Sequence, residues 1–276
     1  MATPPPEPRP ESLTESVPGP LLELDGVSKR FGQVVIATDL SLAVGPGDTV
    51  GIVGPNGAGK TSLFGLISGD LTPDAGAVRF AGRTVTKLDS AGRCRLGIGR
   101  TYQVPRPFGD MTVFENLLVA AQQGGGLRRR ASYAAAAAAL DRAGMAAQAN
   151  VPAERLGLLQ RKRLELARAL ATQPSLLLLD EVAGGLTDPE VAQLVEIVRG
   201  VNADGVAVIW IEHVVRALTA TVRRLICLTG GKFVGDGDPA TVLATPAVRE
   251  VFLGGAVTAA LTAGRLEAAV DGEEAP

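Results

Sequence analysis

The sequence predicts an α/β protein whose core is a mostly parallel sheet, with an N-terminal antiparallel β subdomain and an inserted α-helical subdomain. The first observation is an apolar strand at 49–53 that leads through a glycine-rich loop into a helical segment at 62–67. The second is a set of continuous apolar runs at 176–179, 206–211 and 224–228, with helical segments between them. Strands buried on both faces that alternate with helices are typical of parallel sheets with right-handed crossovers.

The opening of the chain predicts the antiparallel part. Residues 22–27 and 40–44 alternate apolar and polar side chains, which is typical of half-buried strands. A Gly-Pro-Gly break at 45–47 ends the second strand before the apolar run begins. Residues 1–20 are rich in proline and lack apolar periodicity, so we expect a disordered leader there.

The middle of the chain predicts helices, at 112–121, 131–149 and 161–172. We expect them to form a helical subdomain over about 104–172. The second helix is nearly all alanine, which favours helix formation but supplies little apolar volume for packing. Residues 255–276 have a weak pattern and an acidic end, so we expect a flexible tail. One domain, at 21–254, is expected between the leader and the tail.

Composition narrows the class of protein. The chain has 276 residues and 46% hydrophobic content, enough for one large α/β domain. Its 27 basic and 29 acidic side chains give no indication of a globally basic surface for nucleic acid. Cys94 and Cys227 lie far apart without metal-type spacing, which favours a reduced, cytosolic chain. No apolar stretch approaches the length of a membrane span, and no signal-peptide pattern is expected.

The loop at 54–61 is the strongest functional signal. It comprises Gly54, Pro55, Asn56, Gly57, Ala58, Gly59, Lys60 and Thr61, and Ser62 follows it. Glycines let backbone N–H groups converge on an anion, and the helix after the loop directs its positive end to the same place. Lys60 can contact the β- and γ-phosphates, and the Thr61 hydroxyl can bind Mg²⁺. The sequence therefore predicts a P-loop NTPase core that binds a nucleotide.

Two carboxylates, Asp180 and Glu181, follow the apolar strand at 176–179. A buried parallel strand delivers both to the C-terminal edge of its sheet, where ligands bind in open α/β proteins. Asp180 can hold Mg²⁺, and Glu181 can orient or deprotonate a water aimed at the γ-phosphate. The alternative is an ordinary strand end with two solvated acids, and the phosphate loop favours the functional interpretation.

Three further side chains are candidates for the site. His213, the single histidine, follows the strand at 206–211 and should emerge at the same edge as Asp180, where it can hydrogen-bond the γ-phosphate. Gln103 follows a short run at 98–102 and carries no signal by itself. Phe31 lies near a strand end and can either stack on a base or fill the core.

This combination resembles the ATP-binding subunits of ABC transporters over about residues 22–254. The resemblance implies the ABC ATPase fold, with Walker A at 54–61 and Walker B at 176–181. It implies ATP and Mg²⁺ as cofactors. It assigns catalytic roles to Lys60, Gln103 of the Q-loop, Glu181 and His213 of the H-loop, metal binding to Thr61, Gln103 and Asp180, and adenine stacking to Phe31.

Several segments, at 100–103, 111–120, 163–170, 211–213 and 235–254, resemble the branched-chain amino acid branch of that family, of the LivG type. The resemblance implies ATP hydrolysis by a homo- or heterodimer of such subunits beneath two membrane permeases, served indirectly by an extracytoplasmic solute-binding protein. It implies a cytoplasmic chain, peripheral on the inner face of the cell membrane. The expected cargo is branched-chain amino acids or related amides, and no nucleic-acid partner is expected.

One segment departs from the family pattern, in which the signature is ideally Leu-Ser-Gly-Gly-Gln. Here it is Leu156, Gly157, Leu158, Leu159 and Gln160. In the family this signature caps a helix that faces the γ-phosphate of the opposite subunit's ATP. Gly157 lacks the serine hydroxyl and Leu159 adds bulk, so we expect weaker transition-state stabilisation at the partner's site. The alternative is that backbone N–H groups suffice. Smaller departures are Val182, where proline is common, and Thr187, where aspartate is.

The leading hypothesis is an ATPase subunit of an importer. A regulatory or structural subunit that binds ATP and barely hydrolyses it is the second, favoured by the altered signature and opposed by Glu181 and His213. A soluble ABC-type ATPase of nucleic-acid maintenance or translation is opposed by the single ATP-binding unit and the missing basic face. A P-loop kinase has the least support, because nothing in the sequence indicates an acceptor pocket or a lid.

Overall fold

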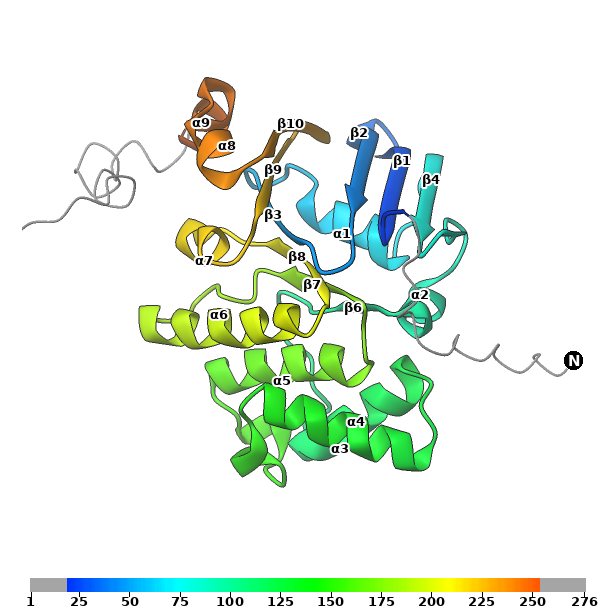
Figure 1. Cartoon of the computed structure of the whole chain (residues 1–276), viewed down its shortest axis with the longest axis vertical. Helices are drawn as coiled ribbons and strands as arrows, with labels where there is room; N and C mark the ends of the chain where they lie inside the picture. The colour runs from blue at the N-terminus through cyan, green and yellow to red at the C-terminus, as the bar shows by residue number, and fades with distance from the viewer. Residues whose placement is uncertain (1–18, 254–276) are drawn as a thin grey trace, which may run out of the picture.

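The parallel sheet forms the middle layer of the molecule (Figure 1). The structure, a computed structural model, describes residues 19–253, so the predicted tail and all but Gly19 and Pro20 of the predicted leader lie outside it. The strand order is β10-β9-β3-β8-β7-β6, parallel except that β10 pairs antiparallel with β9. The bounds are β3 Thr49–Val53, β6 Ile98–Arg100, β7 Leu176–Asp180, β8 Ala207–Ile211, β9 Arg224–Thr229 and β10 Lys232–Gly237.

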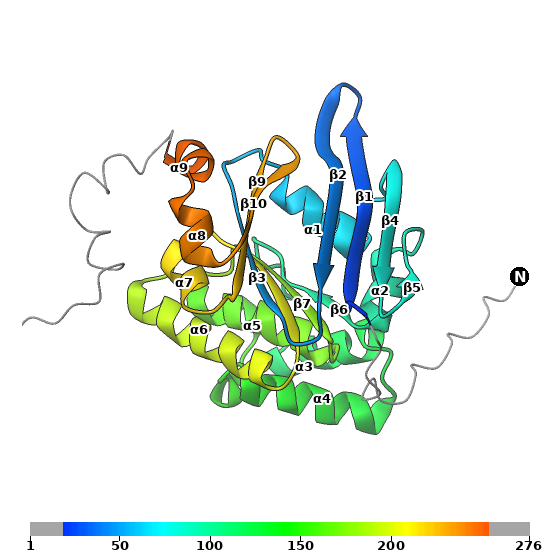
Figure 2. The same ribbon diagram turned by 45° about the horizontal axis from the view of Figure 1, so that its top comes forward.

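The second sheet is antiparallel, as predicted, with the order β2-β1-β4-β5. Its strands are β1 Leu22–Phe31, β2 Val34–Val44, β4 Ala75–Phe80 and β5 Arg83–Thr84. The hairpin of β1 and β2 extends beyond the predicted strands and projects at the top of Figure 2. At its end Phe31 pairs with Val34 while both side chains are exposed, so the apolar alternation stops before the ladder does.

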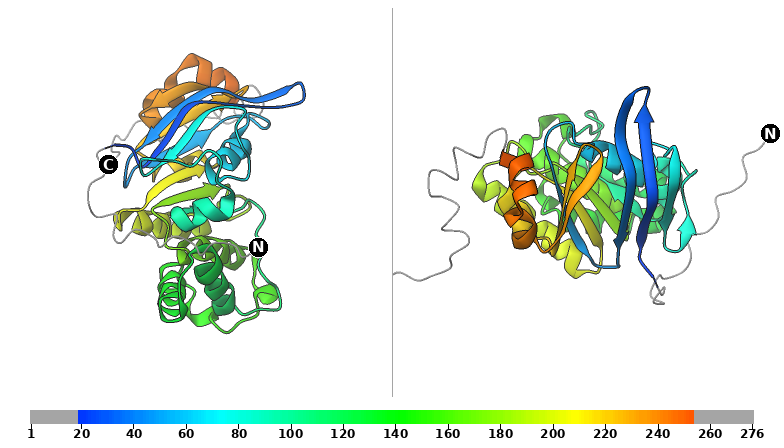
Figure 3. Two further views of the ribbon diagram at one scale, coloured as in Figure 1. Left: turned by 90° about the vertical axis from the view of Figure 1, so that its right-hand side faces the viewer. Right: turned by 90° about the horizontal axis from the view of Figure 1, so that it is seen from above.

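Helices cover both faces of the parallel sheet. Helix α1, Lys60–Ser68, lies between the two sheets, and α6, Asp188–Ala203, lies on the opposite face (Figures 1 and 3). Glu190 caps α6 by accepting hydrogen bonds from the amide and hydroxyl of Thr187, which explains why threonine serves at that position. The other helices here are α2 Ser90–Leu96, α7 Val215–Thr219, α8 Pro239–Ala244 and α9 Pro246–Leu253.

The helical region lies below the sheet in Figure 1. It contains α3 Val113–Val119, a π-helical turn Ala120–Gly124, α4 Arg129–Arg142, short 3₁₀ turns at Ala146–Gln148 and Ala153–Arg155, and α5 Leu158–Ala171. The helix predicted at 131–149 is wrong in extent, because Gly144 adopts a left-handed φ of 63° that terminates α4. The helix predicted at 161–172 begins three residues earlier, at Leu158.

Two hydrophobic clusters pack on opposite faces of the parallel sheet. In β7, Leu177 and Leu179 belong to the cluster with α3–α6, whereas Leu176 and Leu178 belong to the cluster with α1 and the antiparallel sheet. This burial on both faces is what the continuous apolar runs predicted. Among the described residues, none of the helices has the length and apolar character that crossing a membrane requires.

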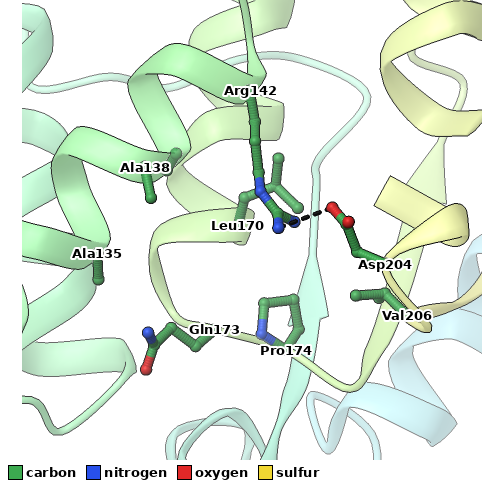
Figure 4. Close-up of a pocket in the computed structure, with 9 residues that line it drawn as sticks. Ala135, Ala138, Arg142, Leu170, Gln173, Pro174, Asp204 and Val206 are labelled. Atoms are coloured by element: carbon green, nitrogen blue, oxygen red, sulfur yellow. Dashed lines mark ion pairs between the residues drawn. The ribbon is translucent and has the colours of Figure 1, made fainter. Parts of the chain in front are cut away.

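A pocket of about 260 Å³ lies where α4 meets the parallel-sheet layer (Figure 4). Its walls come from α4, the end of α5 and the turn before β8. An ion pair of 2.7 Å joins two of its lining residues, Arg142 and Asp204, and connects the helical region to the end of α6. None of the residues predicted for nucleotide binding lines this pocket.

Candidate functional site

The predicted site residues follow four neighbouring parallel strands, β3, β8, β7 and β6. The phosphate loop follows β3, His213 follows β8, Glu181 follows β7 and Gln103 follows β6. Because the strands are parallel, all four segments leave the sheet at its carboxyl edge. Lys60 and His213, which are 153 positions apart in the sequence, are thereby brought to the same edge of the sheet.

The phosphate loop is shaped by glycines with positive φ. Gly54, Gly57 and Gly59 have φ values of 155°, 80° and 102°. A Cβ on Gly54 would overlap the carbonyl oxygen of Leu228, and one on Gly59 would lie 2.6 Å from that of Ile36. Gly59 is the N-cap of α1 and has no side chain to cap the helix, so the first N–H groups of the helix are available to an anion. The loop therefore needs glycine for its conformation and for its close neighbours.

Lys60 folds back onto the loop that precedes it. Its Nζ donates to the carbonyl oxygens of Gly54 and Pro55, at 2.7 and 3.0 Å. Burial lowers the pKa of Lys60, and the nearby carboxylates of Glu181 and Asp180 oppose that shift. The ammonium is therefore held within the loop, where it faces the negative end of the site.

Asp180 is 2% exposed and forms an ion pair of 3.1 Å with Arg100 through Oδ2. Burial raises the pKa of Asp180, and the Arg100 guanidinium opposes the rise. Within the described part of the chain, its other oxygen, Oδ1, is buried and has no hydrogen-bond partner. An orphaned carboxylate oxygen is an oxygen ligand of the kind that Mg²⁺ takes, so Asp180 fits the predicted metal site together with the exposed hydroxyl side chain of Thr61.

Glu181 is held by two of the other predicted residues. Gln103 Nε2 donates to its Oε2 at 2.5 Å, and His213 Nε2 lies 2.6 Å from its Oε1. Glu181 itself has a φ of 48°, unusual for a residue with a side chain, so the turn after β7 is strained. Gln103, Glu181 and His213 are far apart in the sequence, and they meet because β6, β7 and β8 are parallel neighbours in the sheet.

Two buried charges that sequence reasoning missed support this turn. Lys162 on α5 donates to the carbonyl oxygen of Glu181 at 3.1 Å, and burial lowers its pKa. Glu212, 1% exposed, accepts from the backbone amides of Ala183 and His213 at 2.8 and 2.9 Å. A carboxylate directly before the candidate histidine was the available signal for Glu212. Lys162 had no signal, because its helical position resembles a solvated lysine.

Phe31 lies at the end of β1 and is 52% exposed, with Lys29 Nζ 5.4 Å from the centroid of its ring. The hairpin approaches the phosphate loop through β2, because Thr38 donates to the carbonyl of Gly231, whose amide in turn donates to Ala58. The exposed ring is thus available to stack on a base.

The altered signature forms the start of α5. Gly157 is its N-cap and offers no side-chain acceptor to the first turn. Gln160 Oε1 accepts from the Gly157 amide at 3.3 Å. Leu158 is 51% exposed and Leu159 is half-buried, so apolar side chains surround the helix N-terminus. Residues 158–160, expected before the helix, lie within it.

A glycine loop at a helix N-terminus, beside two strand-end carboxylates, defines a P-loop nucleotide-binding α/β protein. The ABC transporter family model matches residues 37–184. The chain therefore belongs to the ABC transporter family, as an ATP-binding subunit and an ATPase, in its LivG and BraF branch.

The relatives support this branch. The high-affinity branched-chain amino acid transport ATP-binding protein LivG of Escherichia coli strain K12 is 34% identical, covering 85% of this chain and 98% of LivG. BraF of Pseudomonas aeruginosa, described in the same words, is 33% identical with the same coverage. The lipopolysaccharide export system ATP-binding protein LptB of Acidithiobacillus ferridurans is 32% identical, covering 85% of this chain and 97% of LptB.

Solved structures support the fold. A nucleotide-free ATP-binding cassette from an ABC transporter has a TM-score of 0.78 at 27% identity, covering 84% of this chain and 98% of the cassette. The ADP conformation of another such cassette also has a TM-score of 0.78, at 28% identity, covering 85% and 98%. The predicted fold class is therefore confirmed.

Proposed function

We propose that this chain binds and hydrolyses ATP with Mg²⁺ to power a membrane importer. The observation that carries the proposal is the placement of Gln103 and His213 on the two oxygens of Glu181, at the sheet edge that carries the phosphate loop. Hydrolysis needs a positioned carboxylate near the γ-phosphate, and this grouping supplies one. A chain that only bound nucleotide would have no use for it.

The phosphate loop would hold the nucleotide. Its backbone N–H groups, with those of Thr61 and Ser62 at the start of α1, would cradle the phosphates. Lys60 would exchange its two carbonyl acceptors for phosphate oxygens, since it already lies in the loop. Phe31 would stack on adenine from the end of the hairpin.

Thr61, Gln103 and Asp180 would hold Mg²⁺, which when bound neutralises charge on the β- and γ-phosphate oxygens. Asp180 contributes the unpartnered Oδ1. Gln103 would contact the metal through its Oε1, because its Nε2 donates to Glu181.

Glu181 would orient the attacking water and accept its proton. The strained turn and the hydrogen bond from Lys162 to its backbone carbonyl fix where the side chain leaves the sheet. His213 would hold the carboxylate on one side and contact the γ-phosphate through its ring. These roles place the two side chains in one functional unit.

We propose a domain at 21–254, with a helical subdomain at about 104–172 that contacts two permease subunits. Four exposed apolar side chains between β6 and α3 support a protein partner there: Tyr102, Val104, Phe108 and Met111. The second ATP-binding subunit would meet the start of α5, where the signature lies. On this proposal the chain is cytoplasmic and peripheral on the inner face of the cell membrane.

The cargo we propose is branched-chain amino acids or related amides, since LivG and BraF are transport proteins for branched-chain amino acids by name. The similarity to LptB, an export protein by name, is nearly as high. The proposed direction of transport and the proposed cargo therefore depend on the assignment of this chain to the LivG and BraF branch. A solute-binding protein would act indirectly, through the permeases.

A second function is a regulatory or structural subunit with weak hydrolysis. The apolar start of α5 favours it, because Gly157 offers no side-chain acceptor and Leu159 replaces the glycine of the family pattern. An assay of ATP hydrolysis by the purified chain, alone and with its partner subunit and permeases, separates the two functions. Turnover that requires Glu181 supports the ATPase of an importer, whereas tight ATP binding with no turnover supports the regulatory subunit.

A further inference from the structure

The guanidinium of Arg100 lies at the centre of a charge cluster at the end of β6. Its Nη2 pairs with Asp180 Oδ2 at 3.1 Å, and its Nη1 pairs with Asp70 Oδ2 at 2.8 Å. The same Nη1 donates to Ser68 Oγ at 3.0 Å, and that hydroxyl donates to Asp70 at 2.9 Å. One cation therefore bridges two carboxylates that come from different elements.

Aromatic rings fix the position of this guanidinium. Its central carbon lies 5.7 Å from the centroid of Phe64 and 5.0 Å from that of Tyr102. The Arg100 side chain is 9% exposed and that of Asp180 is 3% exposed, so little water competes for their ion pair. Cation–π contacts and burial make the geometry of the pair far less adaptable than that of a surface salt bridge.

The bridge connects the candidate metal ligand to the helix that carries the nucleotide. Helix α1 begins at Lys60 in the phosphate loop and ends at Ser68, next to Asp70. Arg100 is thus attached to the far end of that helix and to the carboxylate at the end of β7. The Arg100 side chain therefore fixes the position of the Asp180 carboxylate relative to α1, the helix whose first turn would bind the phosphates.

We propose that Arg100 is a positioning residue for the metal site. It occupies Oδ2 of Asp180 and so leaves Oδ1 as the oxygen that binds the divalent cation. This inference rests on the proposed function, because it assumes that Asp180 is a ligand of Mg²⁺. Without Arg100, the buried carboxylate loses the partner that fixes its orientation.

Binding of a fluorescent methylanthraniloyl-ATP to the full chain tests this role. Its affinity is measured first in EDTA and then across a series of Mg²⁺ concentrations, which gives the Mg²⁺ midpoint. Arg100→Met retains the packing between the rings and removes the charge. We expect it to raise the midpoint about tenfold, with the affinity in EDTA unchanged within twofold. Arg100→Lys, which keeps one charge, should raise the midpoint about threefold and covers the case in which Arg100→Met does not fold.

Arg168 supplies a matched control. It also pairs with a buried carboxylate, Glu165, at 3.0 Å and lies 5.5 Å from the ring centroid of Phe108, but it contacts neither Asp180 nor Arg100. Arg168→Met should leave the Mg²⁺ midpoint within twofold. Equal midpoints in the wild type and both Arg100 variants overturn the inference alone. A wild type that binds the nucleotide without any response to Mg²⁺ overturns the proposed metal site and the inference with it.

Discussion

His213 Nε2 and Glu181 Oε1 lie 2.6 Å apart, although the two residues are 32 positions apart in the sequence. The contact forms because β7 and β8 are parallel neighbours, paired in register from Leu176 and Ala207 to Asp180 and Ile211. Glu212 fixes the backbone on both sides by accepting from the amides of Ala183 and His213. The contact between His213 and Glu181 therefore depends on the pairing of β7 with β8 and on the buried carboxylate of Glu212.

This pair should behave as one unit in hydrolysis. We expect Glu181→Gln and His213→Ala each to lower ATP turnover of the assembled transporter by about hundredfold, with ATP affinity kept within about threefold. The double variant should be little slower than either single variant, because residues that act together are not additive. Steady-state phosphate release and nucleotide binding measure both effects. Additive losses would show that the two side chains act separately.

Lys60 and the altered signature predict unequal sites if the partner is a different subunit. This chain's phosphate loop would pair with the partner's signature, and its own signature would serve the partner's ATP. We therefore expect Lys60→Ala to abolish turnover of the mixed dimer, while the equivalent lysine change in the partner lowers it less than about threefold. Turnover that survives Lys60→Ala and is lost in the partner's variant would contradict this assignment.

Leu159 should weaken the stabilisation that the N-terminus of α5 gives to the γ-phosphate of the partner subunit's ATP. Replacement of Leu159 by glycine removes the side chain next to the helix N-terminus, and we expect ATP turnover of the complex to rise about fivefold. Leu159→Ala is the matched control, since it removes most of the bulk without the cost of about 1 kcal/mol that glycine carries in a helix. An unchanged rate in both variants would show that the backbone N–H groups already suffice.

Asp180 predicts a pH-dependent stability. Because burial raises the pKa of its carboxyl in the folded chain, the folded state binds a proton more tightly than the unfolded state does. The ionised carboxylate therefore costs stability at neutral pH, and the cost decreases as pH falls through the raised pKa towards 3.8. Asp180→Asn removes this charge. We expect its Tm in EDTA to exceed the wild-type Tm at pH 7.5, because the uncharged amide does not carry the cost of burying a charge.

The same comparison at a lower pH should give a smaller difference in Tm, because the raised pKa of the Asp180 carboxyl lets the folded chain take up a proton more readily than the unfolded chain. A difference that is negative, or that does not change with pH, would contradict the account. Hydrolysis by Asp180→Asn should be lost at both pH values, which separates the stability of the fold from the function of the site.

Asn116 predicts a purely structural effect. It is fully buried on α3, and its side chain accepts from the Phe108 amide while donating to the carbonyls of Phe108, Met111 and Thr112. Asn116→Ala leaves the Phe108 amide without its acceptor, whereas the three carbonyls keep backbone donors, so we expect a loss of about 1–3 kcal/mol in the free energy of unfolding. Urea denaturation measures it. A loss below about 0.5 kcal/mol would show that water replaces the side chain.

Much of the fold was predictable because hydrophobic pattern reports burial directly. The apolar runs at 49–53, 176–179 and 206–211 became β3, β7 and β8, and the antiparallel opening was also correct. The end of the β1–β2 hairpin was not predictable, since its ladder continues where the side chains are exposed. The early end of α4 depends on the left-handed conformation of Gly144, which an alanine-rich pattern conceals.

The site was predictable only in part. Resemblance to a family identifies the residues that contact the substrate, but it does not identify the residues that support them. Gln103 has no signal of its own in the sequence, and the structure places it on Glu181. Arg100, Lys162 and Glu212 are charged, so the sequence alone predicts that their side chains are exposed to solvent. In the structure each side chain has a partner at the base of the site. Buried ions depend on tertiary partners, and no local period marks them.

The phosphate loop packs against residues 228–231, a segment that is synthesised long after the loop. Gly54 lies against the carbonyl of Leu228, and the Gly231 amide donates to the Ala58 carbonyl. β3 also has β8 and β9 as its two neighbours in the sheet. Such long-range closure is slow to form, and a nascent chain emerges from its N-terminus. ATP capture should therefore begin only once residues beyond 231 have left the ribosome, so nucleotide binding reports a completed fold.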